Sequence, residues 1–398
     1  MKIFSRQKYL SRIEPFIGRD IIKVLTGLRR VGKTTLLLQI KEHILQKYPG
    51  AEILHIDKEA YEYKDILTHE DFYQYVRTHT SGSERRVVLI DEIQEITGFE
   101  TALKYLLKEG YDLYCTGSNA RMFSGELATY LSGRYMEWHI CPLGYDEFLQ
   151  ARALPDSDET LLQYIRYGGM PYLLQLALDD AIVYEYLRNI LNTVILKDVI
   201  ARHRIRDIDF LERLILYLAE NTGQYVSAKK IADFLKSQRI RLSVNTVMNY
   251  LKYLTQAFLV DEVKRYDLKG KRIFEINEKY YFEDLGMRHT LLPYRPDDAG
   301  KVMENLVYNK LAMEDYEVHT GKWDDWEIDF VARKGEKTVY IQVAYLLESE
   351  ETVRREFGNL LKIPDNHPKI VVSASPFLSG NYEGILHMPV RKFLLEFE

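Results

Sequence analysis

The chain has 398 residues, of which 46% are hydrophobic and 28% charged, and its formal net charge is −5. This length suggests roughly two to four domains with buried cores. This net negative charge excludes a nucleic-acid binder that is basic over its whole surface, but it is compatible with basic surfaces on parts of the molecule. No apolar run approaches the ~20 residues that span a bilayer, and the N-terminal residues lack the pattern of a signal peptide. We therefore expect a cytoplasmic protein without a membrane partner.

The two cysteines, Cys115 and Cys141, lie in or near predicted strands. Their spacing fits neither a set of metal ligands nor a disulfide framework. We expect them to be small core residues in a reducing compartment.

The strongest local motif is Gly-x-x-x-x-Gly-Lys-Thr, which follows the apolar, β-branched run 20–26 and precedes helical spacing over 35–45. Such a loop between a strand and a helix binds phosphate groups through backbone N–H groups and the helix N-terminus. Lys33 would meet the β- and γ-phosphates, and the Thr34 hydroxyl would ligate Mg²⁺. A glycine-rich turn that matches by chance is the alternative. The predicted cofactor-binding residues of the loop are Gly27, Leu28, Arg29, Arg30, Val31, Gly32, Lys33, Thr34 and Thr35.

A second polar group follows the apolar strand predicted over 85–92. Asp91 at the end of a buried strand can hold Mg²⁺, usually through water. Glu92 is placed to polarise an attacking water as a general base, and Gln94 could support that water. The alternative is a solvated strand end without a catalytic role.

Further strands are predicted over 51–57, 112–120 and 134–140, and they alternate with helical segments. This order predicts an α/β fold with a doubly wound parallel sheet. Because ligands bind at the carboxyl ends of parallel strands, Ser118 and Asn119 would sense the γ-phosphate or position water. They could equally cap the next helix, and both roles are compatible.

The motifs GLRRVGKTT, VVLIDEIQ, CTGSNA, LSGRY and CPLGYDEF together resemble the prokaryotic AAA+-type P-loop ATPases that carry a C-terminal domain of unknown function. The resemblance covers nearly the whole chain. It implies a five-stranded ATPase core over 1–150 and a site for ATP and Mg²⁺. It also implies that Arg134 is an arginine sensor or finger, with a surface salt bridge as the alternative. Whether Arg29 and Arg30 touch phosphate or anchor the loop is open.

Helical patterns over 151–205 predict a helical lid, interrupted by Gly168-Gly169-Met170-Pro171. This turn resembles the motif that signalling-type ATPases of the same superfamily place beside the adenine ring, which would make Pro171 a cofactor-binding residue. An ordinary helix–helix turn is the alternative.

Three helical segments and a strand pair over 206–292 predict a winged helix-turn-helix. Basic residues on the second helix and the wing suit contacts to the phosphates of double-stranded DNA, but acids are interspersed. The recognition helix begins at Ser243 without an arginine to read guanine. DNA contact and docking of a protein both stay open. The basic residues are Lys229, Lys230, Lys236, Arg239, Arg241, Lys264, Arg265, Lys269, Lys271 and Arg272.

The order of predicted elements over 299–398 resembles the restriction-endonuclease-like fold. There a helix glutamate, a strand aspartate and a Glu/Gln-x-Lys on the next strand surround a metal. The matching positions are Glu304, Asp329 and Gln342, but Ala344 stands where the lysine is expected. Lys362 could reach in from elsewhere, although nothing in the sequence shows it. We therefore expect a degenerate nuclease site that serves a structural, partner-binding or nucleic-acid-binding role.

The sequence as a whole predicts an ATP-binding, Mg²⁺-dependent ATPase that acts as a nucleotide-driven switch, with DNA contact through the winged helix still open. An ATP-regulated nuclease and a signalling scaffold that binds only protein partners are the alternatives. A protein partner at the C-terminal domain and a homo-oligomer are also open.

Overall fold

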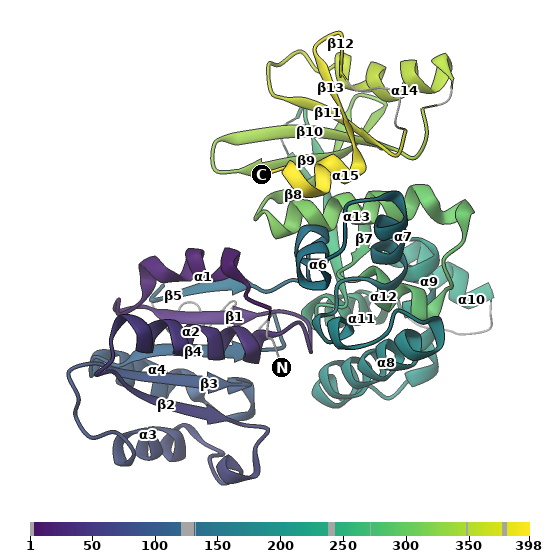
Figure 1. Cartoon of the computed structure of the whole chain (residues 1–398). Helices are drawn as coiled ribbons and strands as arrows, with labels where there is room; N and C mark the ends of the chain where they lie inside the picture. The colour runs from purple at the N-terminus through teal and green to yellow at the C-terminus, as the bar shows by residue number, and fades with distance from the viewer. Residues whose placement is uncertain are drawn as a thin grey trace. The chain divides into compact units, whose positions relative to one another are not determined.

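The computed structural model describes residues 4–120, 131, 133–237, 243–270, 272–347, 349–375 and 380–398 (Figure 1). They form two compact units. Unit 1 comprises Met1–Cys141 with Gln256–Phe258, and unit 2 comprises Pro142–Thr255 with Leu259–Glu398. Four residues that the sequence singles out lie outside the described residues: Ser132, Arg239, Arg241 and Lys271.

Unit 1 is built on a five-stranded sheet in the order β2-β3-β4-β1-β5, in which every paired strand is parallel. The α/β core predicted from the alternating elements is therefore confirmed. Its elements are α1 (Gln7–Ile13), β1 (Ile22–Thr26), α2 (Lys33–Lys47), β2 (Glu52–Asp57), α3 (His69–Thr78), β3 (Arg86–Asp91), α4 (Phe99–Lys108), β4 (Asp112–Gly117) and β5 (Tyr135–His139).

The inner strands β1, β3 and β4 bury both of their faces, which is why their sequences are largely continuous apolar runs, whereas the edge strands β2 and β5 are partly exposed. Val24, Val88 and Cys115 lie in one core with the apolar side chains of α3 and α4. Successive strand residues point to opposite faces, so Leu25 and Leu89, both fully buried, serve the other core. The connecting helices thus hold the sheet rigid, and the polar residues fall at its edges.

Unit 2 begins with a series of helices, and its last three helices pack on its sheet. They are α6 (Tyr145–Arg152), α7 (Asp158–Tyr167), α8 (Asp180–Thr193), the π-helix Val194–Ala201, α9 (Ile208–Glu220), α10 (Ala228–Ser237), α11 (Val244–Gln256, whose last residue is assigned to unit 1), α12 (Leu285–Leu291), α13 (Ala299–Met313), α14 (Glu350–Leu361) and α15 (Val390–Glu396).

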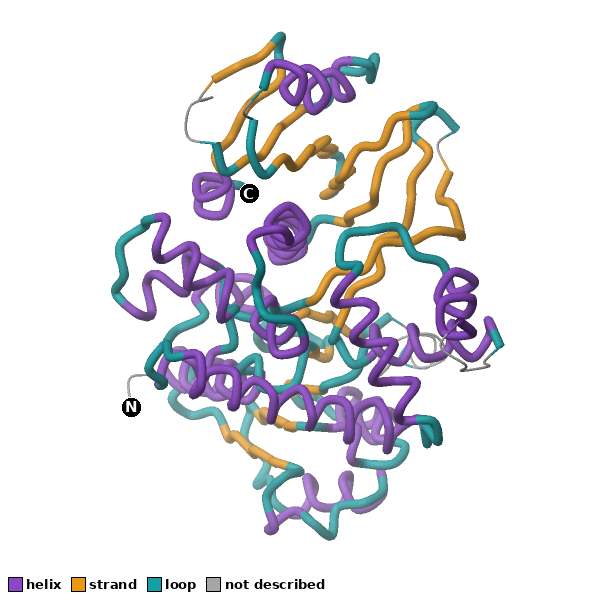
Figure 2. Tube along the Cα trace, turned by 90° about the vertical axis from the view of Figure 1, so that its right-hand side faces the viewer, coloured by secondary structure: helices purple, strands orange, loops and turns teal. Residues whose placement is uncertain are grey.

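The sheet of unit 2 has eight strands in the order β12-β13-β11-β10-β9-β8-β6-β7, and its pairings are mixed parallel and antiparallel. The strands are β6 (Val260–Asp267), β7 (Arg272–Phe282), β8 (Glu317–Trp323), β9 (Trp326–Lys334), β10 (Lys337–Ala344), β11 (Lys369–Ser373), β12 (Gly380–Tyr382) and β13 (Ile385–Pro389). Figure 2 shows these strands in orange, and α13 packs against β7, β8, β9 and β10.

The strand pair predicted as a wing is not separate from the C-terminal elements. Arg265, Tyr266 and Asp267 of β6 pair in parallel with residues of β8, so the hairpin β6–β7 belongs to the eight-stranded sheet. The expected boundary between 206–292 and 299–398 therefore divides one continuous sheet. Backbone hydrogen bonds between the strands are the physical reason, and local periodicity could not reveal them.

Candidate active site

The phosphate loop follows β1, and a close approach of two backbone segments fixes its start. Gly27 has a φ of +142°, and a Cβ placed there would lie 2.3 Å from the Ile140 carbonyl oxygen. Only glycine fits such a position. Lys33, at the first turn of α2, donates from Nζ to the carbonyl oxygens of Gly27 at 2.9 Å and Leu28 at 3.0 Å. The loop thus holds its lysine where the predicted phosphates would arrive.

Asp91 ends β3 beside Thr34, as predicted for a pair of Mg²⁺ ligands. Its side chain is 3% exposed and accepts a short hydrogen bond from Thr116 Oγ1 on β4. Burial raises the pKa of Asp91, while hydrogen bonds from Thr116 and Thr34 oppose that rise. A hydroxyl and a carboxylate are the oxygen donors that a hard cation prefers, so these residues fit Mg²⁺.

Glu92 follows directly, and its backbone is left-handed with a φ of +53°. That conformation is costly for a residue with a Cβ and is typical of active sites. The Glu92 backbone N–H donates to Thr116 Oγ1 at 3.0 Å, and its carboxylate accepts from Ser118 Oγ at 3.2 Å and from the Gln94 amide. The predicted general base is therefore oriented by two polar side chains, and the structure brings Ser118 to it.

The other residues predicted at this edge differ in their surroundings. Asn119 is 6% exposed and is the second residue after β4. Arg29 is buried and forms an ion pair with Glu59 at 3.1 Å, so it anchors the loop to the segment after β2. Arg30 is exposed with a φ of +71°. The two arginines thus differ in their surroundings, and whether either of them touches phosphate is still open.

Arg134 does not join this group. The Ile22 backbone N–H donates to the Arg134 carbonyl oxygen at 2.9 Å, which places Arg134 beside the first residue of β1. The phosphate loop follows Thr26 at the opposite end of that strand, about 13 Å away at about 3.3 Å per residue. An arginine at the start of β5 therefore lies at the other edge of the sheet from the phosphate loop of its own chain.

Pro171 lies in unit 2, where it begins the 3-10 helix Pro171–Gln175. The turn before it is held by backbone contacts. The Gly169 N–H donates to Asp284 Oδ2 at 2.7 Å, and its carbonyl accepts from the Leu143 N–H at 2.7 Å. The glycines therefore allow this turn to pack closely inside unit 2, while the role of Pro171 beside adenine stays a prediction.

The three residues of the predicted degenerate nuclease site do lie together in unit 2. The Asp329 backbone N–H donates to Gln342 Oε1 at 3.4 Å, and Gln342 Nε2 donates to Glu356 Oε2 at 3.0 Å. Lys279 of β7 connects this group to the helix, because its Nζ lies 2.9 Å from Glu304 Oε1 and 3.8 Å from Asp329 Oδ1.

Sequence reasoning missed Thr116, Lys279 and Glu356. Thr116 could have been found from its position two residues before Ser118 on the same buried strand. Lys279 alternates with Tyr281 on one strand face, and a lysine within the run KYYF was the signal that it is buried. Glu356 stands next to Arg355 on an amphipathic helix and gave no signal of its own.

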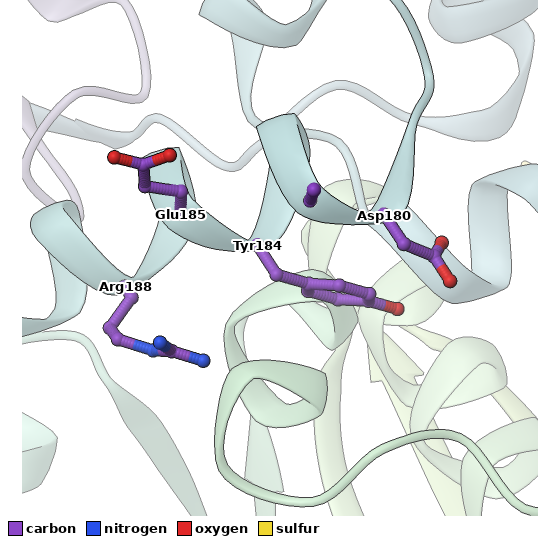
Figure 3. Close-up of a pocket in the computed structure, with 5 residues that line it drawn as sticks. Asp180, Tyr184, Glu185 and Arg188 are labelled. Atoms are coloured by element: carbon purple, nitrogen blue, oxygen red, sulfur yellow. The ribbon is translucent and has the colours of Figure 1, made fainter.

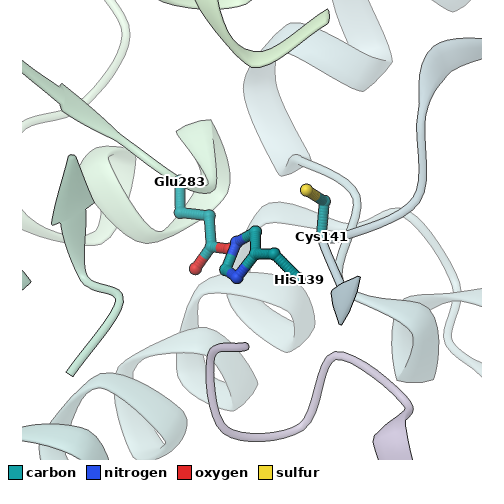
Figure 4. Close-up of side chains that lie close together, drawn as sticks. All are labelled: His139, Cys141 and Glu283. Carbon is teal, nitrogen blue, oxygen red and sulfur yellow. The ribbon is translucent and has the colours of Figure 1, made fainter. Parts of the chain in front are cut away.

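Other polar groups of the described residues do not form a convincing site. An open hollow in unit 2 is lined by residues of α8 alone, with charges of both signs: Asp180, Ala181, Tyr184, Glu185 and Arg188 (Figure 3). His139 and Cys141 belong to unit 1 and Glu283 to unit 2, so we treat them as separate groups (Figure 4). Both cysteines are buried, as predicted, and no described helix is long and apolar enough to cross a membrane.

Comparison with known proteins agrees with this geometry. A family described as "AAA domain" matches residues 19–149, and one described as "Domain of unknown function (DUF8612)" matches residues 158–298. The Walker-type ATPase paby2304 of Pyrococcus abyssi has a TM-score of 0.50 at 16% identity, over 73% of this chain and 96% of its own. It shares the fold.

Two relatives are similar along most of their length. An uncharacterized protein of Haemophilus influenzae is 36% identical over 401 residues, which is 99% of this chain and 99% of that protein. The uncharacterized protein MJ1544 of Methanocaldococcus jannaschii is 30% identical over 370 residues, or 89% and 81% of the two chains. The chain therefore belongs to the same family as these two proteins, and its first unit is a nucleotide-binding P-loop ATPase of the AAA type.

Proposed function

We propose that the protein is a Mg²⁺-dependent ATPase that works as a nucleotide-driven switch. The observation that best supports this function is that Thr34, Asp91 and Glu92 lie together at the carboxyl edge of the unit 1 sheet, directly beside the phosphate loop. These residues supply the hydroxyl and carboxylate for the metal and a carboxylate base for water.

Each residue has one task in this reaction. Lys33 leaves the carbonyls of Gly27 and Leu28 and donates to the phosphate oxygens, and loop N–H groups bind the same anion. Mg²⁺, when bound, neutralises charge on the phosphates. Glu92 accepts a proton from the attacking water, with Ser118 fixing the direction of its carboxylate. Asn119 orients the γ-phosphate or the water.

The test is ATP hydrolysis by the purified chain with Mg²⁺, measured with Glu92→Gln as the blank. We expect turnover that the variant loses while it still binds ATP. Equal hydrolysis by wild type and variant would remove Glu92 as the base, and absent ATP binding by both would overturn the proposal itself.

We also propose that Arg134 acts on the ATP of a second copy, in a homo-oligomer. Its place at the opposite edge of the sheet supports a role in trans rather than in cis. The test mixes two inactive variants, Arg134→Ala and Glu92→Gln. Mixed oligomers should regain hydrolysis, because the Glu92→Gln copy offers its arginine to the intact base of the other. Hydrolysis by Arg134→Ala alone at the wild-type rate would leave Arg134 as a surface residue, and two inactive variants that do not regain hydrolysis when mixed would contradict a role in trans.

The proposed output is contact with double-stranded DNA through α11, with protein docking as the alternative outcome. The exposed face of α11 has amides and one cation but no acid: Ser243, Asn245, Asn249 and Lys252. Amide side chains can read adenine, and lysine suits phosphate. The wing is less suited to this contact, because Lys264, Lys269 and Arg272 each pair with a carboxylate of the same unit.

Binding to labelled duplex DNA over a range of salt concentrations tests this contact. Asn245→Ala with Asn249→Ala should weaken binding, whereas Asn189→Ala on α8 is the matched control. If DNA neither binds nor stimulates ATP hydrolysis, we expect the chain to contact a protein partner instead. A pull-down experiment that tests the surfaces of unit 2 for that partner is then the next step.

We propose that the C-terminal sheet is restriction-endonuclease-like in its arrangement but does not cleave nucleic acid. Two observations support this. Ala344 occupies the position of the expected lysine, and both ends of the Gln342 amide are engaged by Asp329 and Glu356.

A further inference from the structure

Three carboxylates in unit 2 surround one buried lysine, and one of them, Glu327, is 41% exposed. Lys279 is 3% exposed, and its Nζ lies 2.9 Å from Glu304 Oε1, 2.8 Å from Glu327 Oε1 and 3.8 Å from Asp329 Oδ1. Glu304 comes from α13, whereas Glu327 and Asp329 are two residues apart on β9 and share one strand face. Three carboxylates from two elements thus converge on a single ammonium group, which we call the Lys279 cluster.

The ammonium is held where it would compete directly with a metal. Its distances to Glu304 and Glu327 are those of charge-assisted hydrogen bonds. A divalent ion would need the same oxygens at about 2.0–2.6 Å, and a second cation beside Lys279 would be repelled. Three carboxylates within 4 Å of the ammonium favour its charged form at this place.

Neighbouring groups close the Lys279 cluster. Tyr281 donates its hydroxyl to Glu304 Oε1 at 2.6 Å, and the Tyr225 ring lies 5.1 Å from Lys279 Nζ. The turn after α9 approaches from the same side: a Cβ at Gly223 would lie 3.3 Å from the Glu304 carboxyl. Asp329 Oδ2 already accepts the Val343 N–H at 2.8 Å. One oxygen of each carboxylate, Glu304 Oε1, Glu327 Oε1 and Asp329 Oδ2, thus already lies against a protein donor.

We propose that Lys279 is the resident cation of this cluster and stands where a divalent metal would otherwise bind. The proposal goes beyond the ATPase function and does not depend on it. It explains how Glu304 of α13 and Asp329 of β9 can stay together without metal chemistry: the ammonium offsets part of their negative charge and ties β7, β9 and α13 together. Replacing the lysine by an uncharged side chain should turn the cluster into a latent metal site.

The experiment measures Mn²⁺ binding to the full chain without nucleotide, from the loss of the free-ion signal in electron paramagnetic resonance. Every sample carries Asp91→Asn, so that the ATPase site contributes no metal binding. In this background Lys279 should exclude Mn²⁺ at millimolar concentration. Lys279→Met should bind one Mn²⁺ with a dissociation constant on the order of 10⁻⁴ M, and adding Asp329→Asn should remove that binding.

Lys310→Met is the matched control. Lys310 is also a buried lysine, on α13 with Glu304, but it pairs with the single carboxylate of Glu314 at 2.7 Å. Its removal should create no metal site. Thermal unfolding gives a second readout: Mn²⁺ should raise the melting temperature of Lys279→Met and leave that of Lys279-containing chains unchanged.

The proposal stays falsifiable if Lys279→Met does not fold. Mn²⁺ binding by the chain with Lys279 intact, lost on adding Asp329→Asn, would overturn it. So would metal-dependent cleavage of plasmid DNA or RNA that Asp329→Asn abolishes, because Lys279 would then assist a metal rather than replace it. Neither outcome would affect hydrolysis of ATP, so the two proposals fail separately.

Discussion

Two groups of carboxylates in this protein each have a lysine nearby, and the lysines are used in opposite ways. In unit 1, Lys33 is held by the carbonyl oxygens of Gly27 and Leu28, while Asp91 accepts from hydroxyl groups. In unit 2, Lys279 is held by the carboxylates themselves. A lysine that donates to backbone carbonyls leaves the nearby carboxylates available to a metal, whereas a lysine that donates to the carboxylates takes up the oxygens that a metal would need. Residue types alone therefore do not define a metal site.

The two sites also differ in how their residues are distributed along the chain. The phosphate loop is one contiguous stretch at the carboxyl edge of a parallel sheet, where such sheets bind their ligands. The Lys279 cluster joins residues that are far apart along the chain, and Tyr225 and Tyr281 flank it. We therefore expect changes in unit 1 to alter turnover and changes in the cluster to alter stability.

The largest effect should come from Glu92→Gln. Loss of a general base lowers turnover by roughly 10²–10⁴-fold, while the amide keeps the size of the side chain and leaves ATP binding intact. Steady-state hydrolysis combined with ATP binding by fluorescence would measure both. Glu95→Gln, an exposed acid three residues on, is the control and should leave turnover unchanged.

Lys33→Ala should weaken ATP binding by about 100-fold, since the variant loses a charge-assisted contact worth about 2–3 kcal/mol. Isothermal titration with ATP and Mg²⁺ would measure it. The folded state should be retained, because the lysine in these contacts bonds backbone carbonyls of its own loop and no residue of a distant element. Lys41→Ala on the same helix is the control. If Lys33→Ala bound ATP with wild-type affinity, Lys33 would not contact the phosphates, and the proposed difference between Lys33 and Lys279 would be wrong.

Thr116→Val should reduce turnover by about tenfold, or about 1.4 kcal/mol. The Thr116 hydroxyl donates to Asp91 and accepts from the Glu92 N–H, so its loss disturbs the metal ligand and the base together. The Mg²⁺ concentration needed for half-maximal hydrolysis should rise. An unchanged Mg²⁺ dependence would show that Thr116 only stabilises the strand end.

Tyr281→Phe should lower the free energy of unfolding by about 1 kcal/mol without changing ATP turnover. The variant removes a hydroxyl that donates to Glu304 inside the Lys279 cluster. Urea denaturation followed by circular dichroism would measure it, with Tyr172→Phe, an exposed tyrosine of the same unit, as the control. A change in ATP turnover instead would mean that the cluster is coupled to unit 1.

Some of this could be read directly from the sequence. The core strands of unit 1 are continuous apolar runs, and the phosphate loop, Asp91, Glu92 and Ser118 stand at their carboxyl ends. Those positions could be predicted because strand direction in a parallel sheet brings all carboxyl ends to one edge. Most secondary-structure elements of unit 2 were likewise predictable from local periodicity, but α12, β12, β13 and α15 were not predicted.

Tertiary structure alone decided the rest. Sequence patterns showed three candidate metal ligands and a missing lysine, but not that Lys279 would arrive from β7, which is not a neighbour of β9 in the sheet. They could not join the β6–β7 hairpin to the C-terminal sheet. The physical reason is common to both. Local spacing determines which element a residue joins and which face it occupies, whereas strand pairing and burial of distant side chains determine which charges finally meet.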